Sequence, residues 1–86
     1  MKKIEYNAQK NVVHRQMKKA RIAAGMSQSQ LAAKIQTLGV NIDQQMISKI
    51  ENNNRIVTDY ELACLCKIFG VEEKSLLKDF YENRYE

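Results

Sequence analysis

The 86-residue sequence predicts an all-α fold in which five helices form one compact domain. Apolar residues recur at spacings of three and four through most of the chain, as they do on one face of a helix. The chain contains no proline, and each of its three glycines comes where an apolar stripe stops, which is a common position for glycine after a helix. No repeat, low-complexity segment or interior linker interrupts this pattern, so a single helical domain is expected.

The composition suits a globular protein with a weak preference for polyanions. Hydrophobic residues make up 44% of the chain and charged residues 28%, which allows both a small core and a solvated surface. The net charge of +4 favours a polyanionic partner such as nucleic acid, although many basic proteins bind none. No apolar run approaches the roughly 20 residues of a membrane span, and Glu5 interrupts the signal-like start of the chain. A cytoplasmic protein without membrane contact is therefore expected.

The cysteines and the histidine favour neither a disulfide nor a metal site. Cys64 and Cys66 are two residues apart, so on a helix they point to different faces and do not pair with each other. A zinc site needs about four ligands, and the single His14 is distant in the sequence. We therefore expect reduced thiols, no metal and no cofactor.

The polar N-terminal residues 1–10 have weak periodicity and are predicted to form a flexible arm. Such an arm either touches a nucleic acid or is simply a disordered terminus. Residues 11–80 are predicted to form the domain, and residues 81–86 a ragged C-terminal tail. Asn11 is a candidate N-cap for the first helix, which Gly25 ends. The apolar stripe of this helix consists of Val13, Met17, Ala20 and Ala24.

The second helix is predicted to begin at a capping box. The hydroxyl of Ser27 accepts from the N–H of Gln30, whose side-chain amide reaches back to the N–H of Ser27. Gly39 stops the helix, and residues 40–42 form a turn that leads to Asp43. The apolar stripe of this helix consists of Leu31, Ala32, Ile35 and Leu38.

The third helix is predicted over residues 43–52 and divides into an apolar and a polar arc. Asp43 is a good N-cap because its short carboxylate accepts from the first unpaired backbone N–H groups. Glu51 lies at the border between the two arcs. The apolar arc consists of Met46, Ile47 and Ile50, and the polar arc consists of Gln44, Gln45, Ser48, Lys49 and Asn52.

The polar arc of this helix carries amides, a hydroxyl and one cation, whereas an ordinary solvated face is rich in Glu and Lys. An amide offers a donor and an acceptor together, which matches the N6 donor and the N7 acceptor of adenine in the major groove. A lysine suits a phosphate or a guanine edge. These side chains favour a recognition helix in a DNA groove. A short amphipathic helix that only exposes polar residues is the alternative interpretation.

The chain after the third helix is predicted to form a polar loop and then a fourth helix. The loop consists of Asn53, Asn54 and Arg55, whose amides and guanidinium group can meet phosphates. Thr58 and Glu61 form a second capping box, which starts the fourth helix. The core face of that helix consists of Leu62, Leu65, Cys66 and Phe69, and Gly70 ends it.

The C-terminal part of the domain is predicted to be one short fifth helix. This helix runs from about residue 73 to residue 80 and buries Leu76 and Leu77. Tyr81 and Tyr85 follow in the tail, where they either contact a dimer partner or cap the end of the core.

Two short helices joined by a turn, the second of them presenting glutamines, make a helix-turn-helix. The segments that carry a further resemblance are Arg21–Gln30, Leu31–Ile35, Gln45–Glu51 and Leu62–Val71. In these segments the chain resembles the Cro and lambda-repressor type of helix-turn-helix domain, also called the XRE type. The start Ser-Gln-x-x-Leu-Ala and the end Ile-Ser-Lys-Ile-Glu are specific as a set, and either alone is weak. The resemblance covers roughly residues 12–78 and implies a lambda-repressor-like fold.

The resemblance also implies roles for individual residues. Gln28, at the N-terminus of the second helix, corresponds to the family's phosphate-clamping glutamine, and helix N-termini suit phosphates in any case. Arg21 and Glu51 correspond to a structural ion pair between the first and third helices. Gln44, Gln45, Ser48 and Lys49 match positions directed at base edges and flanking phosphates, and Asn52, Asn53, Asn54 and Arg55 match the loop that meets the DNA backbone.

The connection between the second and third helices departs from the family pattern. Family members have a very short turn there, whereas Gln36 to Val40 look like about five extra residues. Either the second helix is about a turn longer or the turn is enlarged. The depth at which the third helix enters a groove is therefore left open.

The amide face and the resemblance together imply a sequence-specific regulator of transcription that binds double-stranded DNA. A repressor that binds a pseudo-palindromic operator as a homodimer is expected. An antitoxin or a protein-interaction module of the same fold, with a protein partner, is the alternative. An enzyme is not expected, because the sequence has no glycine-rich phosphate loop, no metal-ligand cluster and no nucleophile beside a base.

Overall fold

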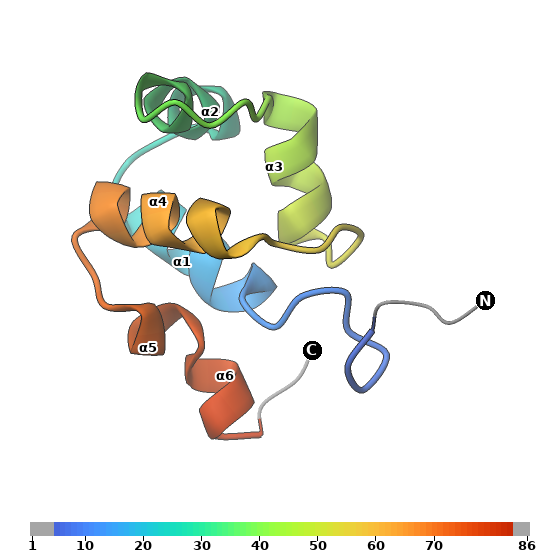
Figure 1. Ribbon diagram of the computed structural model, residues 1–86. Coiled ribbons are helices and arrows are strands. Elements are labelled where there is room, and N and C mark those ends of the chain that lie inside the picture. Colours follow the sequence, from blue (N-terminus) through green and yellow to red (C-terminus); the bar gives the residue numbers. More distant parts are fainter. Residues whose placement is uncertain (1–4, 84–86) are drawn as a thin grey trace.

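The computed structural model describes residues 5–83, and these residues form six α-helices without a β-strand (Figure 1). The helices are α1 (His14–Ala23), α2 (Gln28–Thr37), α3 (Gln44–Glu51), α4 (Asp59–Phe69), α5 (Glu73–Leu76) and α6 (Lys78–Tyr81). Helix α2 packs against both α3 and α4, and α1 contacts α3, α4, α5 and α6. The predicted all-α fold class is confirmed.

The number of helices differs from the prediction because the expected fifth helix is divided at Leu77. Leu77 is both the C-cap of α5 and the N-cap of α6, and its backbone has φ −91° and ψ 9°. The chain turns there and brings Asp79 against α1, where its carboxylate accepts hydrogen bonds from Arg15 and Gln16. The prediction of one continuous helix over residues 73–80 was therefore wrong, because two short helices occupy this segment. Leu76 is buried as expected.

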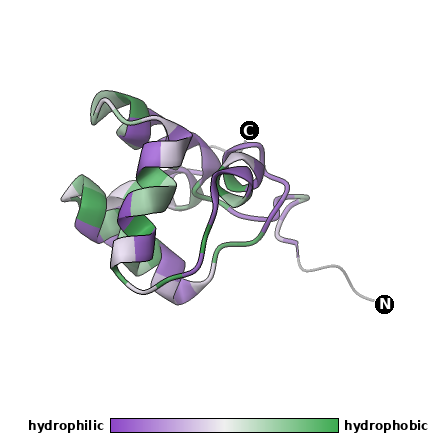
Figure 2. Cartoon of the chain, turned by 90° about the horizontal axis from the view of Figure 1, so that it is seen from above, coloured by the Kyte–Doolittle hydropathy of each residue, from purple (hydrophilic) through white to green (hydrophobic). Residues whose placement is uncertain are grey.

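One core of apolar side chains holds the helices together. Each fully buried Leu, Ile or Met contributes about 1.5–3 kcal/mol by leaving water. Figure 2 shows that hydrophobic and hydrophilic residues occupy different sides of the same helices. The predicted stripes of α1 and α2 are buried or half-buried except at their C-terminal ends, where Ala24 and Leu38 are exposed. The buried apolar residues are Val13, Met17, Leu31, Ala32, Ile35, Ile42, Ile47, Ile50, Cys64, Leu65, Cys66 and Leu76.

The predicted helix starts of α2 and α3 are confirmed by their caps. Ser27 Oγ accepts from the N–H of Gln30 at 3.0 Å, and Gln30 Oε1 accepts from the N–H of Ser27 at 2.8 Å. Asp43 Oδ1 accepts from the N–H of Met46 at 2.8 Å. These bonds satisfy N–H groups that have no partner inside a helix, so the starts of both helices are fixed locally.

Helix α4 has the predicted caps at both of its ends. At its start Thr58 Oγ1 accepts from the N–H of Glu61 at 3.3 Å, and Glu61 Oε1 accepts from the N–H of Thr58 at 3.0 Å. At its end Gly70 adopts φ +67°, a left-handed conformation that glycine takes without a steric cost. The chain then leaves α4 for the short C-terminal helices.

The expected role of Asn11 as the N-cap of α1 was wrong. Helix α1 begins at His14, and its N-cap Val13 provides no side-chain hydrogen bond. The side-chain oxygen of Asn11 accepts from the N–H of Val13 at 3.1 Å, and Asn11 lies two residues before the position of the N-cap. Its amide nitrogen donates to the backbone oxygens of Ile50 and Arg55, so Asn11 joins the N-terminal segment to the end of α3.

The described part of the expected N-terminal arm lies against the domain. Tyr6 and Gln9 close a tight turn through two backbone hydrogen bonds of 2.7 and 2.8 Å. The side chain of Gln9 is buried, and the ring of Tyr6 lies 5.3 Å from the ring of Phe80 in α6. Residues 1–4 of the arm lie outside the described residues, and the boundary at residue 10 stays a prediction.

The extra residues between α2 and α3 form an enlarged turn. Helix α2 continues to Thr37, and residues 38–43 then lead back to the start of α3. Gln36 Nε2 donates to the backbone oxygen of Ile42 at 2.7 Å, and the side chain of Ile42 is buried in the core. The turn is therefore anchored at both of its ends, which positions the N-terminus of α3.

The cysteines and the potential metal ligands form neither a disulfide nor a metal-binding cluster within residues 5–83. Cys64 and Cys66 are free and buried, and burial raises the pKa of the Cys66 thiol. No group of three potential metal-ligating side chains occurs within residues 5–83. In the same part of the chain no helix has the length and apolar content that a membrane crossing requires.

Candidate nucleic-acid interface

Helix α3 presents one polar and one apolar face, as the sequence predicted. Ile47 and Ile50 are fully buried, and Met46 packs against the core from its edge. The polar arc is turned outward: Gln44, Gln45, Lys49 and Asn52 are exposed and Ser48 is half-buried. Asn52 is the C-cap of α3 and not part of its last turn. The exposed face is therefore a row of amides with one ammonium group.

The first glutamine of α3 is bonded to the first residue of α2. Gln44 Nε2 donates to Gln28 Oε1 at 2.9 Å. Gln28 Nε2 in turn donates to Glu51 Oε1 at 3.1 Å, at the other end of α3. Gln28 therefore bridges the start and the end of α3 and limits the positions that Gln44 can take.

Arg21 and Glu51, which the resemblance pairs, meet in the structure. Arg21 Nε donates to Glu51 Oε2 at 2.7 Å and Arg21 Nη2 donates to Glu51 Oε1 at 3.0 Å. A third bond joins Arg21 Nη1 to the backbone oxygen of Met26. The two side chains are 12% and 2% exposed, and the hydrogen bonds to Glu51 raise the pKa of Arg21 above its ordinary value. The pair is a buried link between α1, the turn before α2, and α3.

The loop after α3 offers exposed amides at its surface. Asn52 Nδ2 lies 3.4 Å from Ser48 Oγ, and the side chain of Asn54 is exposed. The N–H groups of Asn53 and Asn54 donate back to the backbone oxygens of Ile50 and Lys49. These bonds end α3 in a closed turn, so the polar groups of Asn52 and Asn54 are held beside the exposed face of α3.

The guanidinium group of Arg55 forms hydrogen bonds with other residues of the domain. Its Nη1 and Nη2 donate to the two carboxylate oxygens of Glu61, each at 2.9 Å, and Nη1 also donates to the backbone oxygen of Ile56. Burial alone would raise the pKa of Glu61, but hydrogen bonds from Arg55 and Thr58 hold that pKa below its ordinary value. The guanidinium group keeps further N–H donors beyond these three bonds. Sequence reasoning did not find the partner of Arg55.

The cations of α1 fall into two groups. Arg15 forms two hydrogen bonds with Asp79, of 3.1 and 2.9 Å, and Arg21 is bonded to Glu51. Lys18 and Lys19 are exposed on the outer face. The two arginines therefore contribute to the fold, and the two lysines contribute positive charge to the surface.

Sequence reasoning also missed a polar cluster that joins the N-terminal segment to the loop after α3. Asn53 has φ +60°, and its side chain bonds to residues 9–11. The one signal in the sequence was an asparagine directly after a helix end, where a left-handed residue is common. Its partners lie more than 40 positions away, and no local pattern points to them.

A comparison with known protein families agrees with this geometry. A search of curated proteins found no match. A helix-turn-helix family model matches residues 17–76, which is more than two thirds of the chain and extends from α1 to the end of α5. The matched part contains α2, α3 and the loop that follows them. The chain therefore belongs to the XRE/Cro-like helix-turn-helix family, a family of DNA-binding regulators of transcription.

Proposed function

We propose that this protein is a sequence-specific repressor that acts in the cytoplasm and reads the major groove of double-stranded DNA with α3. The observation that carries the proposal is the exposed row of amides on α3, whose first member is held by Gln28. Solvation of the helix does not require a neighbouring side chain that fixes one of its glutamines. A side chain that must match a base edge gains from it, because its orientation is set before binding.

Gln44 and Gln45 are the residues proposed to read bases. A glutamine amide has two N–H donors and one acceptor oxygen. Gln44 uses one donor on Gln28, so its second N–H and its oxygen remain for the N7 and N6 groups of an adenine. Gln45 is exposed beside it. A bias toward A·T pairs at two neighbouring positions is therefore expected.

The surrounding polar groups are proposed to bind phosphates and to fix the register of α3. Gln28 lies at the N-terminus of α2, where free N–H groups and the helix dipole favour an anion. Such contacts supply affinity but little sequence information. The residues assigned to the backbone and to flanking positions are Gln28, Ser48, Lys49, Asn52, Asn54 and Arg55.

A homodimer on a pseudo-palindromic site follows from the same proposal. Two copies of α3 would enter successive major grooves, with half-sites about one helical turn apart. The C-terminal end offers exposed aromatic surface for such a contact, since Tyr81 is exposed and its ring stands edge-on to that of Phe80. Tyr85 lies outside the described residues. Repression would follow from occlusion of a promoter.

Selection from random-sequence duplex DNA at about physiological salt tests the proposal. A two-fold-related motif in the bound pool would support it and would give the half-site spacing. The variant Gln44→Ala with Gln45→Ala should then lose discrimination by about 1–3 kcal/mol for each lost bidentate contact. Ser75→Ala is the control, because Ser75 is exposed in α5, which Figure 1 shows away from α3. A pool without a motif would contradict the proposal and would favour the protein-interaction module.

A further inference from the structure

The N-terminal segment is joined to the loop after α3 through the side chain of Asn53. Asn53 Oδ1 accepts from the N–H of Lys10 at 2.9 Å and from the N–H of Asn11 at 3.3 Å. Asn53 Nδ2 donates to Gln9 Oε1 at 2.9 Å. One side chain of the loop therefore fixes three consecutive residues of the segment.

Asn11 makes a second set of bonds between the same two segments. Its Nδ2 donates to the backbone oxygen of Ile50 at 3.0 Å and to that of Arg55 at 2.9 Å. Asn11 is only 8% exposed, so these bonds are shielded from water. The backbone on both sides of Asn53 is thus fixed to the N-terminal segment.

The identity of residue 53 indicates that the side-chain bonds matter. Asn53 has φ +60°, a left-handed conformation that glycine adopts most easily and that asparagine tolerates. Glycine would supply the turn but none of the bonds to Gln9, Lys10 and Asn11. The N-terminal segment also lies outside the part of the chain that the helix-turn-helix family model matches, which begins at residue 17.

We propose that residues 6–11, here called the N-terminal turn, extend the DNA-backbone interface and that the ammonium group of Lys10 contacts a phosphate. This inference rests on the proposed function. The backbone of Lys10 is bonded to Asn53, and the two neighbours of Asn53 in the loop are Asn52 and Asn54, which the proposed function places on the DNA backbone. The side chain of Lys10 is exposed. Lys10 therefore stands next to the proposed phosphate contacts and adds a positive charge to that of Arg55, whose guanidinium group is bonded to Glu61.

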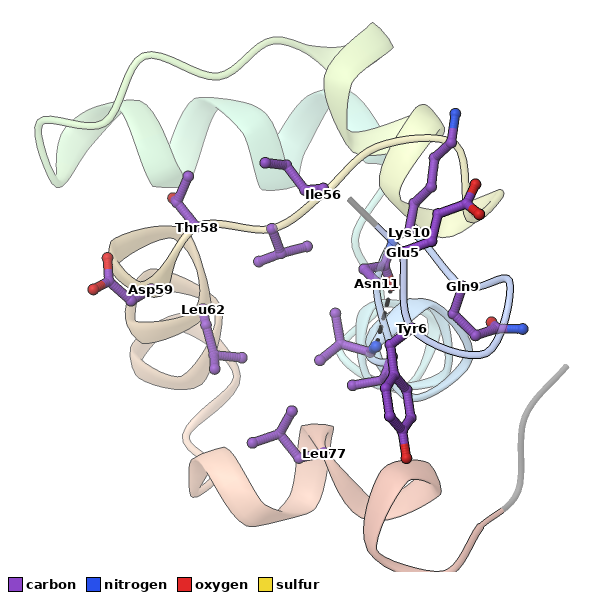
Figure 3. Close-up of a pocket in the computed structure, with 13 residues that line it drawn as sticks. Glu5, Tyr6, Gln9, Lys10, Asn11, Ile56, Thr58, Asp59, Leu62 and Leu77 are labelled. Atoms are coloured by element: carbon purple, nitrogen blue, oxygen red, sulfur yellow. Dashed lines mark hydrogen bonds between the residues drawn. The ribbon is translucent and has the colours of Figure 1, made fainter. Parts of the chain in front are cut away.

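The orientation of Lys10 agrees with this role. The N-terminal turn and the start of α4 enclose a pocket of about 500 Å³, whose apolar wall includes Val13, Leu62 and Leu77. Figure 3 shows the Lys10 side chain directed away from the centre of this pocket, toward the side on which α3 ends. Because the backbone of the turn is already fixed, less conformational entropy is lost when the ammonium group meets a phosphate.

The variant Lys10→Gln tests the contact, and Lys67→Gln is its matched control. Both changes remove one positive charge, and Lys67 lies near the end of α4 that Figure 1 places on the opposite side of the molecule from α3. DNA affinity is measured over a series of salt concentrations. We expect Lys10→Gln to reduce the slope of log K against log salt by about 0.9 and to weaken binding about fivefold near 0.15 M salt, on specific and unrelated duplexes alike. Lys67→Gln should match the wild type.

The variant Asn53→Gly tests whether Asn53 positions Lys10. Glycine keeps the left-handed turn, so a cooperative thermal melt and an unchanged helical spectrum are expected. DNA binding should weaken, and Lys10→Gln should cost less than about twofold when it is added to Asn53→Gly, because the lysine is then no longer held.

Three results would overturn the inference. A Lys10→Gln variant with the affinity and salt slope of Lys67→Gln would exclude the phosphate contact. Full additivity of Lys10→Gln and Asn53→Gly would exclude the positioning role of Asn53. A wild-type protein that binds no DNA would overturn the proposed function and this inference together, whereas the first two results leave the proposed function intact.

Discussion

The amide nitrogen of Gln44, at the start of α3, donates a 2.9 Å hydrogen bond to the amide oxygen of Gln28, at the start of α2. The bond belongs to a longer chain, since Gln28 also donates to Glu51, and Glu51 accepts from Arg21 in α1. The residue proposed to meet the first base is therefore linked to the interior of the domain. Ordering one such side chain at an interface costs about 0.5–1.5 kcal/mol, and part of that cost is already met before DNA binds.

Gln28→Ala should therefore lower sequence discrimination as well as affinity. In this variant Gln44 loses the partner that orients its amide. Sequence preference at the base pair proposed to be read by Gln44 should therefore decline. Preference at the base pair proposed to be read by Gln45 should change little. Competition binding with operators changed at one position at a time measures both preferences. Ser29→Ala, an exposed change at the next position of α2, is the control. Equal weakening on all sequences would show that Gln28 only binds a phosphate.

Glu51→Ala should first of all lower thermal stability. The change leaves the guanidinium group of Arg21, which is 12% exposed, without its charged partner, and breaking a buried ion pair from one side costs about 3–5 kcal/mol. For a domain of this size we expect the melting temperature Tm to fall by more than about 10 °C. Lys49→Ala, an exposed change on the same helix, should melt like the wild type. A Glu51→Ala protein with normal Tm and no DNA binding would assign Glu51 to the interface.

Most of the fold was predictable because its signals are local. The capping boxes at Ser27 and Thr58 involve residues three positions apart, and both are present. The two arcs of α3 follow from helical periodicity over eight residues, and the structure buries Ile47 and Ile50 as that periodicity requires. In each case the partners are neighbours in the sequence, so the side-chain types alone identify the structure.

The missed features depend on partners that are distant in the sequence. Asn11 satisfies the same rules for an N-cap as Ser27 does, yet its amide bonds to Ile50 and Arg55, about 40 positions away. Arg15 is bonded to Asp79 across 64 positions, and the division of the C-terminal helix at Leu77 accompanies that contact. At Asn11 and Leu77 several local structures are compatible with the neighbouring residues. Contacts with distant residues determine which of them forms, and these contacts cannot be read from a single sequence.

Arg55→Ala should lower stability and also reduce the salt dependence of DNA binding. Stability falls because Glu61, whose side chain is 4% exposed, loses both hydrogen bonds from the guanidinium group. The salt slope should fall by about 0.9 if a remaining N–H of Arg55 contacts a phosphate, as proposed. Thermal melts and a salt series on one duplex measure the two effects separately. A lowered Tm with an unchanged slope would restrict Arg55 to a structural role.

Stability should decline in acid because of the contact between Asp79 and α1. Hydrogen bonds from Arg15, and to a smaller extent from Gln16, hold the pKa of Asp79 below its ordinary value. The unfolded chain therefore takes up a proton near pH 4, while the folded protein does not. The stabilisation is fully present above about pH 5 and is lost as the pH falls through the lower, folded pKa. Urea unfolding between pH 7 and pH 3 measures this loss as a fall in the free energy of unfolding.

Asp79→Asn and Arg15→Gln provide the matched test of that acid dependence. Asp79→Asn removes the titrating group, and Arg15→Gln removes the main cause of its low pKa. Both variants should be less stable than the wild type at pH 7, and both should show a shallower decline between pH 5 and pH 3. Part of the decline should remain, because the pKa of Glu61 is also lowered. Curves for Asp79→Asn and the wild type that run parallel over this range would show that Asp79 does not link folding to pH.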